Sequence, residues 1–278
     1  MSWSKLKTII IYILLLLNLF LLGLVGMNRL RAKRYEEAAL SEAAAVLEHN
    51  NIAVDRSGLP GESELRAATV ARDIEKEGRL ARILLGEDVL VSPAGGGMYV
   101  YRGAAGEADF RGNGEFTVTF GQPLEEAPPG ADSPRALMKA LGLRVWETWE
   151  TEDSATAAQS LGGAPVYSGS SGQALGVTYA YDAQGKLSGV SGRIFSGKLA
   201  ADQESEETLS LSTALISFFG FLSDSGDVCR EIRQVSPVYR VAAAGDPVRL
   251  TPAWQFTTDT GEYFLDACTA EVTRRAGE

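Results

Sequence analysis

The hydrophobic positions of this chain fall into two regimes: one unbroken apolar run near the N-terminus, and short patterned runs after it. Residues 8–28 contain no charged side chain. As a helix rising about 1.5 Å per residue, this run reaches roughly 31 Å, about the thickness of a bilayer's hydrocarbon core. It is longer than the apolar region of a signal peptide, and no small-residue cleavage site follows it. The pattern predicts an uncleaved transmembrane helix.

The segment that follows is polar, yet its composition still favours a helix. Residues 29–49 are rich in Ala, Glu and Arg, and no Gly or Pro interrupts residues 27–51. We therefore expect the transmembrane helix to continue as a stalk. Basic residues lie on both sides of the apolar run, so the local charge leaves the orientation in the membrane open.

Beyond the stalk, runs of alternating apolar and polar residues separated by Gly-rich turns predict antiparallel strands. In one of them, Phe116, Val118 and Phe120 alternate with threonines, a pattern typical of a strand with one buried face. Strands are expected at residues 52–54, 89–91, 98–101, 108–111, 115–120, 144–149, 177–181, 187–195, 234–242, 248–258 and 262–267. The triple glycine at 95–97 precedes a strand, which indicates a hairpin turn rather than a phosphate-binding loop.

Helical patterns occur between these strands. One begins near Ser63, and another begins at Pro134 after a cap at Asp132 or Ser133 and runs to about Leu141. The clearest helix covers residues 209–224 and ends before Gly226. Its expected apolar face consists of Leu211, Leu215, Phe218 and Leu222, widened by Ile216 and Phe219.

The alternation of helices with antiparallel strands predicts an α+β fold, with helices packed on one face of each sheet. The Pro-rich segment 125–134 is the best candidate for a domain boundary. The expected parts are a short tail with the transmembrane anchor (1–28), the helical stalk (29–49), a first α+β domain (50–128) and a second (129–278). The soluble part is expected to fold from about Asn50 without the anchor.

The N-terminal part and the rest of the chain also differ in charge. The chain has a formal net charge of −10, and all 36 acidic residues but only 20 of the 26 basic ones lie after Arg34. Such an acidic soluble part argues against nucleic acid as a partner, since phosphates would repel it. Cys229 and Cys268 are too few for a disulfide framework or a zinc cluster. The sequence leaves open whether they form one disulfide or are two small buried side chains.

Residues able to carry catalysis are scarce. The single histidine, His49, lies at the end of the stalk, and no Gly-x-Ser-x-Gly motif or metal-ligand spacing accompanies it. Trp146, Trp149 and Trp254 are expected to lie in the core rather than to stack on a sugar. We expect no catalytic residues, no cofactor and no metal, so a binding or regulatory role is favoured over an enzyme.

The N-terminus also resembles a known family. Residues 1–9 (MSWSKLKTI), followed by residues 16–22 (LLNLFLL), are similar to the anchor of the YycH/YycI proteins of Gram-positive bacteria, and the short ectodomain is closer to YycI. The C-terminal part resembles PepSY-like modules, which place a helix on an antiparallel sheet. Its matching positions are Leu250, Pro252, Trp254, Tyr263, Asp266, Ala267, Thr269, Glu271 and Val272.

The resemblance implies a single-pass protein of the cell membrane, with a cytoplasmic N-terminus and an extracellular domain. It implies a role in regulating a sensor histidine kinase of the WalK (YycG) type, which controls cell-wall metabolism, and a YycH-like partner in a heterodimer. It also implies contacts through the transmembrane helix. The anchor residues suited to such contacts are Asn18, Gly23 and Gly26, because association of helices in a bilayer depends on close packing and polar groups.

An alternative from another class stays open. A membrane-tethered PepSY-like protein can act as an inhibitor or assembly factor for an extracellular hydrolase or protease. Co-purification from membranes discriminates between the two hypotheses, because one predicts a kinase and the other a hydrolase. An anchored cell-wall enzyme is disfavoured by the missing catalytic constellation.

Overall fold

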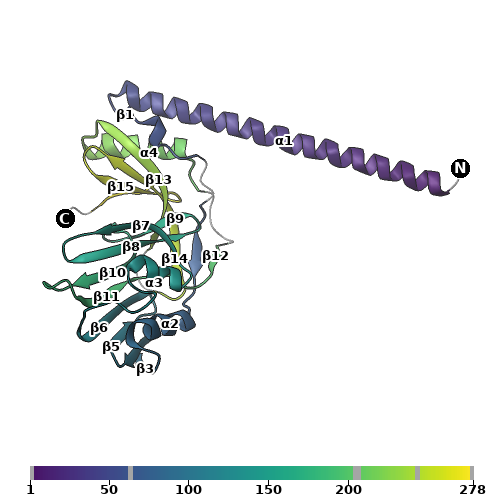
Figure 1. Ribbon diagram of the computed structural model, residues 1–278. Coiled ribbons are helices and arrows are strands. Elements are labelled where there is room, and N and C mark those ends of the chain that lie inside the picture. Colours follow the sequence, from purple (N-terminus) through teal and green to yellow (C-terminus); the bar gives the residue numbers. More distant parts are fainter. Residues whose placement is uncertain (1–2, 62–64, 203–207, 242–244, 276–278) are drawn as a thin grey trace.

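A long helix projects from a β-rich body in the computed structural model, which describes residues 3–61, 65–202, 208–241 and 245–275 (Figure 1). This helix, α1 (Trp3–His49), runs for 47 residues without a break. It is long and apolar enough to cross a membrane, and residues 12–27 are exposed along its outer half. The helix continues through residues 29–49, as their composition predicts.

Two long antiparallel strands form the spine of the body. β13 (Glu231–Val241) and β14 (Val248–Thr258) pair along most of their length, with Val235 opposite Phe256. The strands that extend this pair are β1 (Ala53–Val54), β2 (Ala68–Val70), β9 (Ala164–Ser168), β12 (Leu199–Ala201), β15 (Glu262–Asp266) and β16 (Val272–Arg274). Of these, β1 and β9 lie on β13 in parallel, near its two ends.

A second group of strands continues from β9 through antiparallel neighbours in the order β8, β10, β11, β6, β5, β4, β3, with β7 added on β8. They are β3 (Leu90–Gly95), β4 (Met98–Gly103), β5 (Gly106–Phe110), β6 (Glu115–Leu124), β7 (Arg144–Glu150), β8 (Ser154–Leu161), β10 (Gly176–Tyr181) and β11 (Leu187–Arg193). All the described strands belong to one 16-stranded sheet, which does not close.

Three shorter helices cover this sheet within the described residues: α2 (Ile74–Leu85), α3 (Pro134–Ala140) and α4 (Leu211–Ser225). The Ser133 side chain caps α3 by accepting a hydrogen bond from the Ala136 N–H, as expected. Gly226 ends α4 in the left-handed conformation, at a φ of 73°, which glycine adopts without strain. The structure therefore confirms an α+β fold with a mostly antiparallel sheet and one apolar N-terminal helix.

The predicted apolar face of α4 is largely correct. Leu211, Leu215, Phe218 and Leu222 are all buried against β13, β14 and β15, whereas Ile216 is 42% exposed, so its assignment to that face was wrong. A separate buried cluster lies under α2 and α3 against the second group of strands, and a smaller one joins β2, β9, β13 and β14.

The Pro-rich segment at 125–134 does not coincide with a division of the sheet. Val118 of β6 pairs with Val190 of β11, so strands from both sides of residue 128 share one ladder and one core. The segment itself is packed, because Ala131 is fully buried and its carbonyl accepts a hydrogen bond from the Tyr179 hydroxyl at 2.9 Å.

The helical pattern near Ser63 was interpreted wrongly. Ser63 lies outside the described residues, and the residues soon after it form the strand β2. The helix α2 begins only at Ile74, where the Asp73 carboxylate accepts a hydrogen bond from the Lys76 N–H. Val70 instead pairs with Val248 of β14, a partner far along the chain that no local pattern indicates.

Candidate functional site

The last turns of α1 are built into the body. Ala43, Ala44 and Leu47 are at most 4% exposed and belong to the same buried cluster as Leu215 and Phe218 of α4. Alanine side chains let two helix backbones approach closely, so this part of α1 packs as a core helix. That the soluble part folds from about Asn50 stays a prediction, although the packed segment of α1, which starts near Leu40, adds contacts to its core.

The chain leaves α1 through a tight reversal that fixes the helix to the sheet. Asn51 has a φ of 63°, and the Ile52 N–H donates to the Leu47 carbonyl at 3.0 Å. The Ala53 N–H then donates to the Arg230 carbonyl at 2.8 Å, which starts the parallel pairing of β1 with β13. Both the side of α1 and its end are thus attached to the body.

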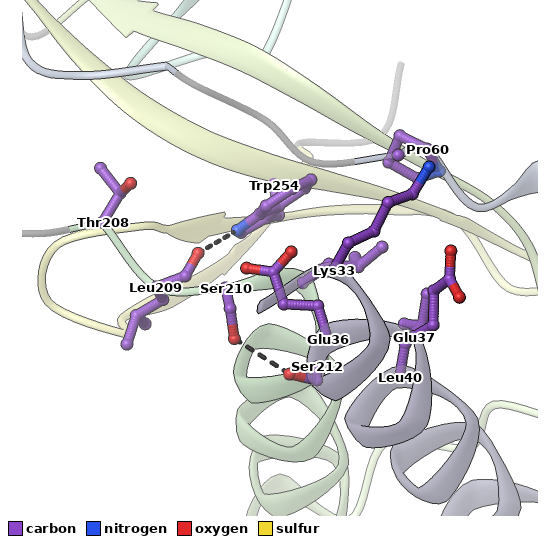
Figure 2. Close-up of a pocket in the computed structure, with 12 residues that line it drawn as sticks. Lys33, Glu36, Glu37, Leu40, Pro60, Thr208, Leu209, Ser210, Ser212 and Trp254 are labelled. Atoms are coloured by element: carbon purple, nitrogen blue, oxygen red, sulfur yellow. Dashed lines mark hydrogen bonds between the residues drawn. The ribbon is translucent and has the colours of Figure 1, made fainter. Parts of the chain in front are cut away.

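A groove of about 260 Å³ opens where α1 first meets the body (Figure 2). One wall is the α1 surface around Leu40, and the opposite wall is the start of α4 with Trp254 of β14. Its lining residues are Lys33, Glu36, Glu37, Leu40, Pro60, Gly61, Thr208, Leu209, Ser210, Leu211, Ser212 and Trp254. We call it the junction groove.

Trp254 holds the inner wall of the junction groove in place. Its side chain is 4% exposed, and the indole Nε1–H donates to the Leu209 carbonyl at 3.0 Å, as Figure 2 shows. The Ser210 hydroxyl caps α4 by accepting from the Thr213 N–H at 3.3 Å. Because these polar groups already have hydrogen-bond partners within the fold, the shape of this wall is fixed.

The chemistry of the junction groove suits binding. Leu40 and Trp254 supply apolar surface, while Lys33, Glu36 and Glu37 surround it with charges of both signs. The lining contains hydroxyl and carboxylate groups, but neither a histidine nor a cysteine that would activate them. A segment bound here would contact α1 and the body at the same time.

The three anchor residues singled out from the sequence lie outside this groove, on the exposed part of α1. The Asn18 side-chain amide donates to the Leu14 carbonyl of the preceding turn at 2.9 Å. A side chain at Gly23 or Gly26 would meet nothing within 4 Å, so both leave room beside the helix. At about 100° per residue, Gly26 lies about 60° from Gly23 and about 80° from Asn18, so it lies between these two residues, which are about 140° apart around α1.

The other residues considered for chemistry are dispersed. His49 is exposed at the end of α1, far along the helix from the anchor. No disulfide joins Cys229 and Cys268, and burial raises the pKa of Cys229 to about 11. Within the ranges that the structure describes, no three acidic, His or Cys side chains are grouped as metal ligands.

The expectation for the tryptophans was partly wrong. Trp254 is buried, as expected, but Trp146 is 48% exposed and Trp149 is 40% exposed. Both lie on β7, which among the described strands pairs with β8 alone and so leaves its other edge without a strand partner there. The register shifts between Val145 and Thr148, and this irregularity interrupts the inward and outward alternation of the strand.

The residues of α1 at the junction groove were missed by the sequence analysis. Leu40, Ala43, Ala44 and Leu47 have the spacing of one helix face, a signal within the stalk that indicates docking rather than a free rod. Trp254 was noted only as a strand residue. Nothing local to it shows that it faces a residue so distant in the sequence.

Comparison with known proteins adds little. No protein-family model matches the chain, and no curated protein sequence is similar to it. Among solved structures, the chain is similar to an uncharacterized protein from Eubacterium rectale ATCC 33656, with a TM-score of 0.44 and 12% sequence identity. That similarity covers 80% of this chain and 89% of the other. A similarity of this degree carries no information about function.

Proposed function

We propose that this protein is a membrane-anchored accessory protein that regulates a sensor histidine kinase of the WalK/YycG type. In this proposal the N-terminus is cytoplasmic, the body is extracellular, and a YycH-like protein forms a heterodimer with it. The resemblance of residues 1–9 and 16–22 to the YycH/YycI anchor supports the assignment. Regulation occurs through contacts between proteins, including contacts of the transmembrane helix, and requires no catalytic residue in this chain.

One observation carries the proposal: α1 is a single helix from its apolar part to its packed end. Because Leu47 is fully buried and β1 pairs with β13, the body cannot reorient freely about the end of α1. A change in the position of the body is therefore transmitted to the apolar part of the helix. A protein that influences a kinase through the membrane needs such a rigid connection.

The face with Asn18, Gly23 and Gly26 is the candidate contact with the kinase's membrane helices. Two glycines three residues apart let a second helix backbone approach closely, and the carboxamide of Asn18 can hydrogen-bond across an interface. Each such contact is small, about 0.6 kcal/mol on average for a polar pair in a membrane protein. Removal of all three together is therefore the informative change.

The test compares two anchor variants of equal hydrophobic length. The first carries Asn18→Leu, Gly23→Leu and Gly26→Leu, and its matched control carries Leu17→Ala and Leu24→Ala on the opposite side of α1. We expect the first to recover several-fold less kinase on co-purification and to change the output of the kinase's regulon. The control should behave as the unaltered chain does.

A complete exchange of residues 8–28 for an unrelated apolar helix gives the decisive outcome. If the exchanged protein still recovers the kinase and leaves regulon output unchanged, the anchor is only a tether and this part of the proposal fails.

A second candidate function has one specific observation in its favour. The packing of α4 on β13, β14 and β15 is the arrangement of a helix on an antiparallel sheet that PepSY-like modules have. On this alternative, the body restrains or assembles an extracellular hydrolase or protease. The same co-purification separates the two candidates, because it would recover a hydrolase and no kinase.

A further inference from the structure

Two arginines from different parts of the sheet line one cavity of about 380 Å³, away from the junction groove. Arg193 ends β11, and Arg240 lies near the end of β13, where β9 joins the two groups of strands. The remaining lining residues are Ser168, Gly169, Ser170, Val241, Thr251 and Asp266. Its volume lies in the range of about 300–1,000 Å³ that is usual for small-molecule sites.

Arg240 is held firmly but is not neutralised. Its Nη1 donates to the Thr273 hydroxyl at 2.7 Å, its Nη2 donates to the Gly169 carbonyl, and its guanidinium lies 5.0 Å from the centre of the Phe264 ring. Its Nε is buried and has no acceptor. Burial lowers the pKa of Arg240, and the more distant carboxylates of Asp266 and Glu271 oppose this only in part.

Arg193 is even less satisfied. Its Nε donates to the Asn113 carbonyl at 2.9 Å, while its Nη2 is buried without an acceptor. Burial lowers the pKa of Arg193, and the nearest opposing charge is Glu115, whose carboxylate already pairs with Arg111 at 3.4 Å. Within the described part of the chain, neither Arg193 nor Arg240 has a carboxylate oxygen within 4 Å.

The balance of charge in this cavity is positive. A guanidinium withdrawn from water without a counter-ion is unfavourable, and here two partly buried ones line the same cavity. Asp266 is the single acid of the lining, and its Oδ1 accepts from the Cys268 and Thr269 N–H groups at 2.8 and 3.0 Å. The hydroxyls of Ser168 and Ser170 hydrogen-bond to each other at 3.1 Å, which leaves one O–H to donate beside the arginines.

We infer that this cavity binds an oxyanion group, the phosphate or carboxylate of a small molecule. Planar guanidinium groups match the oxygens of phosphate and carboxylate, and hydrogen bonds between charged partners are the strong ones. A bound oxyanion supplies negative charge beside both Arg193 and Arg240, which line the cavity. This inference is independent of the kinase and of the anchor.

The test titrates the full-length protein in detergent micelles with inorganic phosphate and, separately, with succinate, by isothermal calorimetry. Sodium chloride at equal ionic strength is the reference, because nonspecific charge screening affects both solutions alike. We expect saturable binding at one site with at least one of the two probes. The probe that binds distinguishes a phosphate ligand from a carboxylate ligand.

Arg193→Gln is the informative variant, since it removes the charge and only one hydrogen bond of the fold. It should weaken binding by about tenfold or more, as loss of a charged hydrogen bond does. The matched control is Arg233→Gln on β13, where Arg233 is 58% exposed and pairs with Glu231. The control should bind as the unaltered chain does.

Two outcomes overturn the inference. One is the absence of saturable heat with both probes in the unaltered protein, a result that does not depend on any variant's folding. The other is equal affinity in Arg193→Gln and Arg233→Gln when both melt as the unaltered chain does. A ligand that binds the native state also raises the melting temperature, which provides a second measurement on the unaltered chain.

Discussion

Arg72 and Glu77 form an ion pair in which both side chains are only 7% exposed. Arg72 donates from Nε and Nη2 to the two carboxylate oxygens at 2.6 and 2.7 Å, and its guanidinium lies 4.9 Å from the centre of the Tyr99 ring. The hydrogen bonds to Glu77 raise the pKa of Arg72, whereas burial raises the pKa of Glu77. The two short hydrogen bonds outweigh the effect of burial, and the pair stays ionised at neutral pH.

Removal of one member of this pair should be far more harmful than removal of both. Arg72→Met leaves the Glu77 carboxylate buried without its partner, so we expect a loss of about 3–5 kcal/mol in the free energy of unfolding. Arg72→Met combined with Glu77→Leu should cost less than the single change. The measurement is urea denaturation followed by fluorescence.

The exposed pair of Arg102 with Glu107 provides the control for this experiment. Its members are 59% and 43% exposed, so Arg102→Met should cost about 1 kcal/mol or less. A loss for Arg72→Met as small as that for Arg102→Met would mean that the buried pair contributes no more than a surface one.

Cys229 gives a prediction about pH. Burial raises its pKa from about 9 to about 11, so at pH 8 it holds about 100-fold less thiolate than an ordinary thiol. Because the pKa is higher in the folded state than in the unfolded state, the protonated thiol stabilises the fold, and this contribution is fully present below about pH 9. That contribution is lost as the pH rises through about 11, so the free energy of unfolding should decrease over this window.

Alkylation by iodoacetamide at pH 8, followed by mass spectrometry on a Cys268→Ser variant, measures this reactivity. We expect Cys229 to react about 100-fold more slowly in the folded protein than in the same protein in urea. Equal rates in the two conditions would show that the thiol is accessible in the folded state.

At the scale of elements, local periodicity predicted what is stabilised locally. The amphipathic face of α4 and its end at Gly226 follow from the sequence because packing and capping act over one turn. Its start was expected at residue 209, whereas the helix begins at Leu211 after the cap Ser210. The strands β8 and β9 were missed, since the alanines and serines of β8 have low strand propensity. Their burial between neighbouring strands stabilises them instead, and this depends on partners that a local pattern does not contain.

The packing of α4 yields a prediction with two adjacent residues. Leu215 is fully buried, so Leu215→Asp places an unpaired carboxylate in the core and should reduce the free energy of unfolding by several kcal/mol. Ile216→Asp, one position along and 42% exposed, should cost about 1 kcal/mol or less. Thermal melts of both variants check this, and an unchanged cooperative melt for Leu215→Asp would contradict the packing of α4.

At the scale of the whole molecule, the sequence predicted the fold class and the apolar helix but neither the continuity of the sheet nor the junction groove. Val118 and Val190 pair across the Pro-rich segment that had suggested a domain boundary. Leu40 and Trp254 meet at the junction groove although they come from opposite ends of the chain. Composition marks flexible or exposed segments, but it does not record which distant segments pack together.

The orientation in the membrane is the prediction at this scale. The described residues contain one helix long and apolar enough to cross a membrane, and a single crossing by it would place the whole body on one side. We expect a phosphatase reporter that is active only outside the cell to be active when fused after Glu278 and inactive when fused before Met1. An inactive C-terminal fusion, with the body protected from protease in intact protoplasts, would place it inside.

Because α1 turns regularly, residues spaced by seven lie on nearly the same side of the helix along its whole length. Gly26, Lys33, Leu40 and Leu47 recur every seven residues, and a straight helix drifts only about 20° per heptad. The stripe that begins at Gly26 thus continues past Lys33 and Leu40 at the junction groove and ends at Leu47 in the core. A second helix lying along α1 at Gly26 would emerge beneath the junction groove. Seven residues inserted at Ala32 change this alignment by only about 20°, whereas two residues, which add about 200°, turn the groove to the opposite side of the helix.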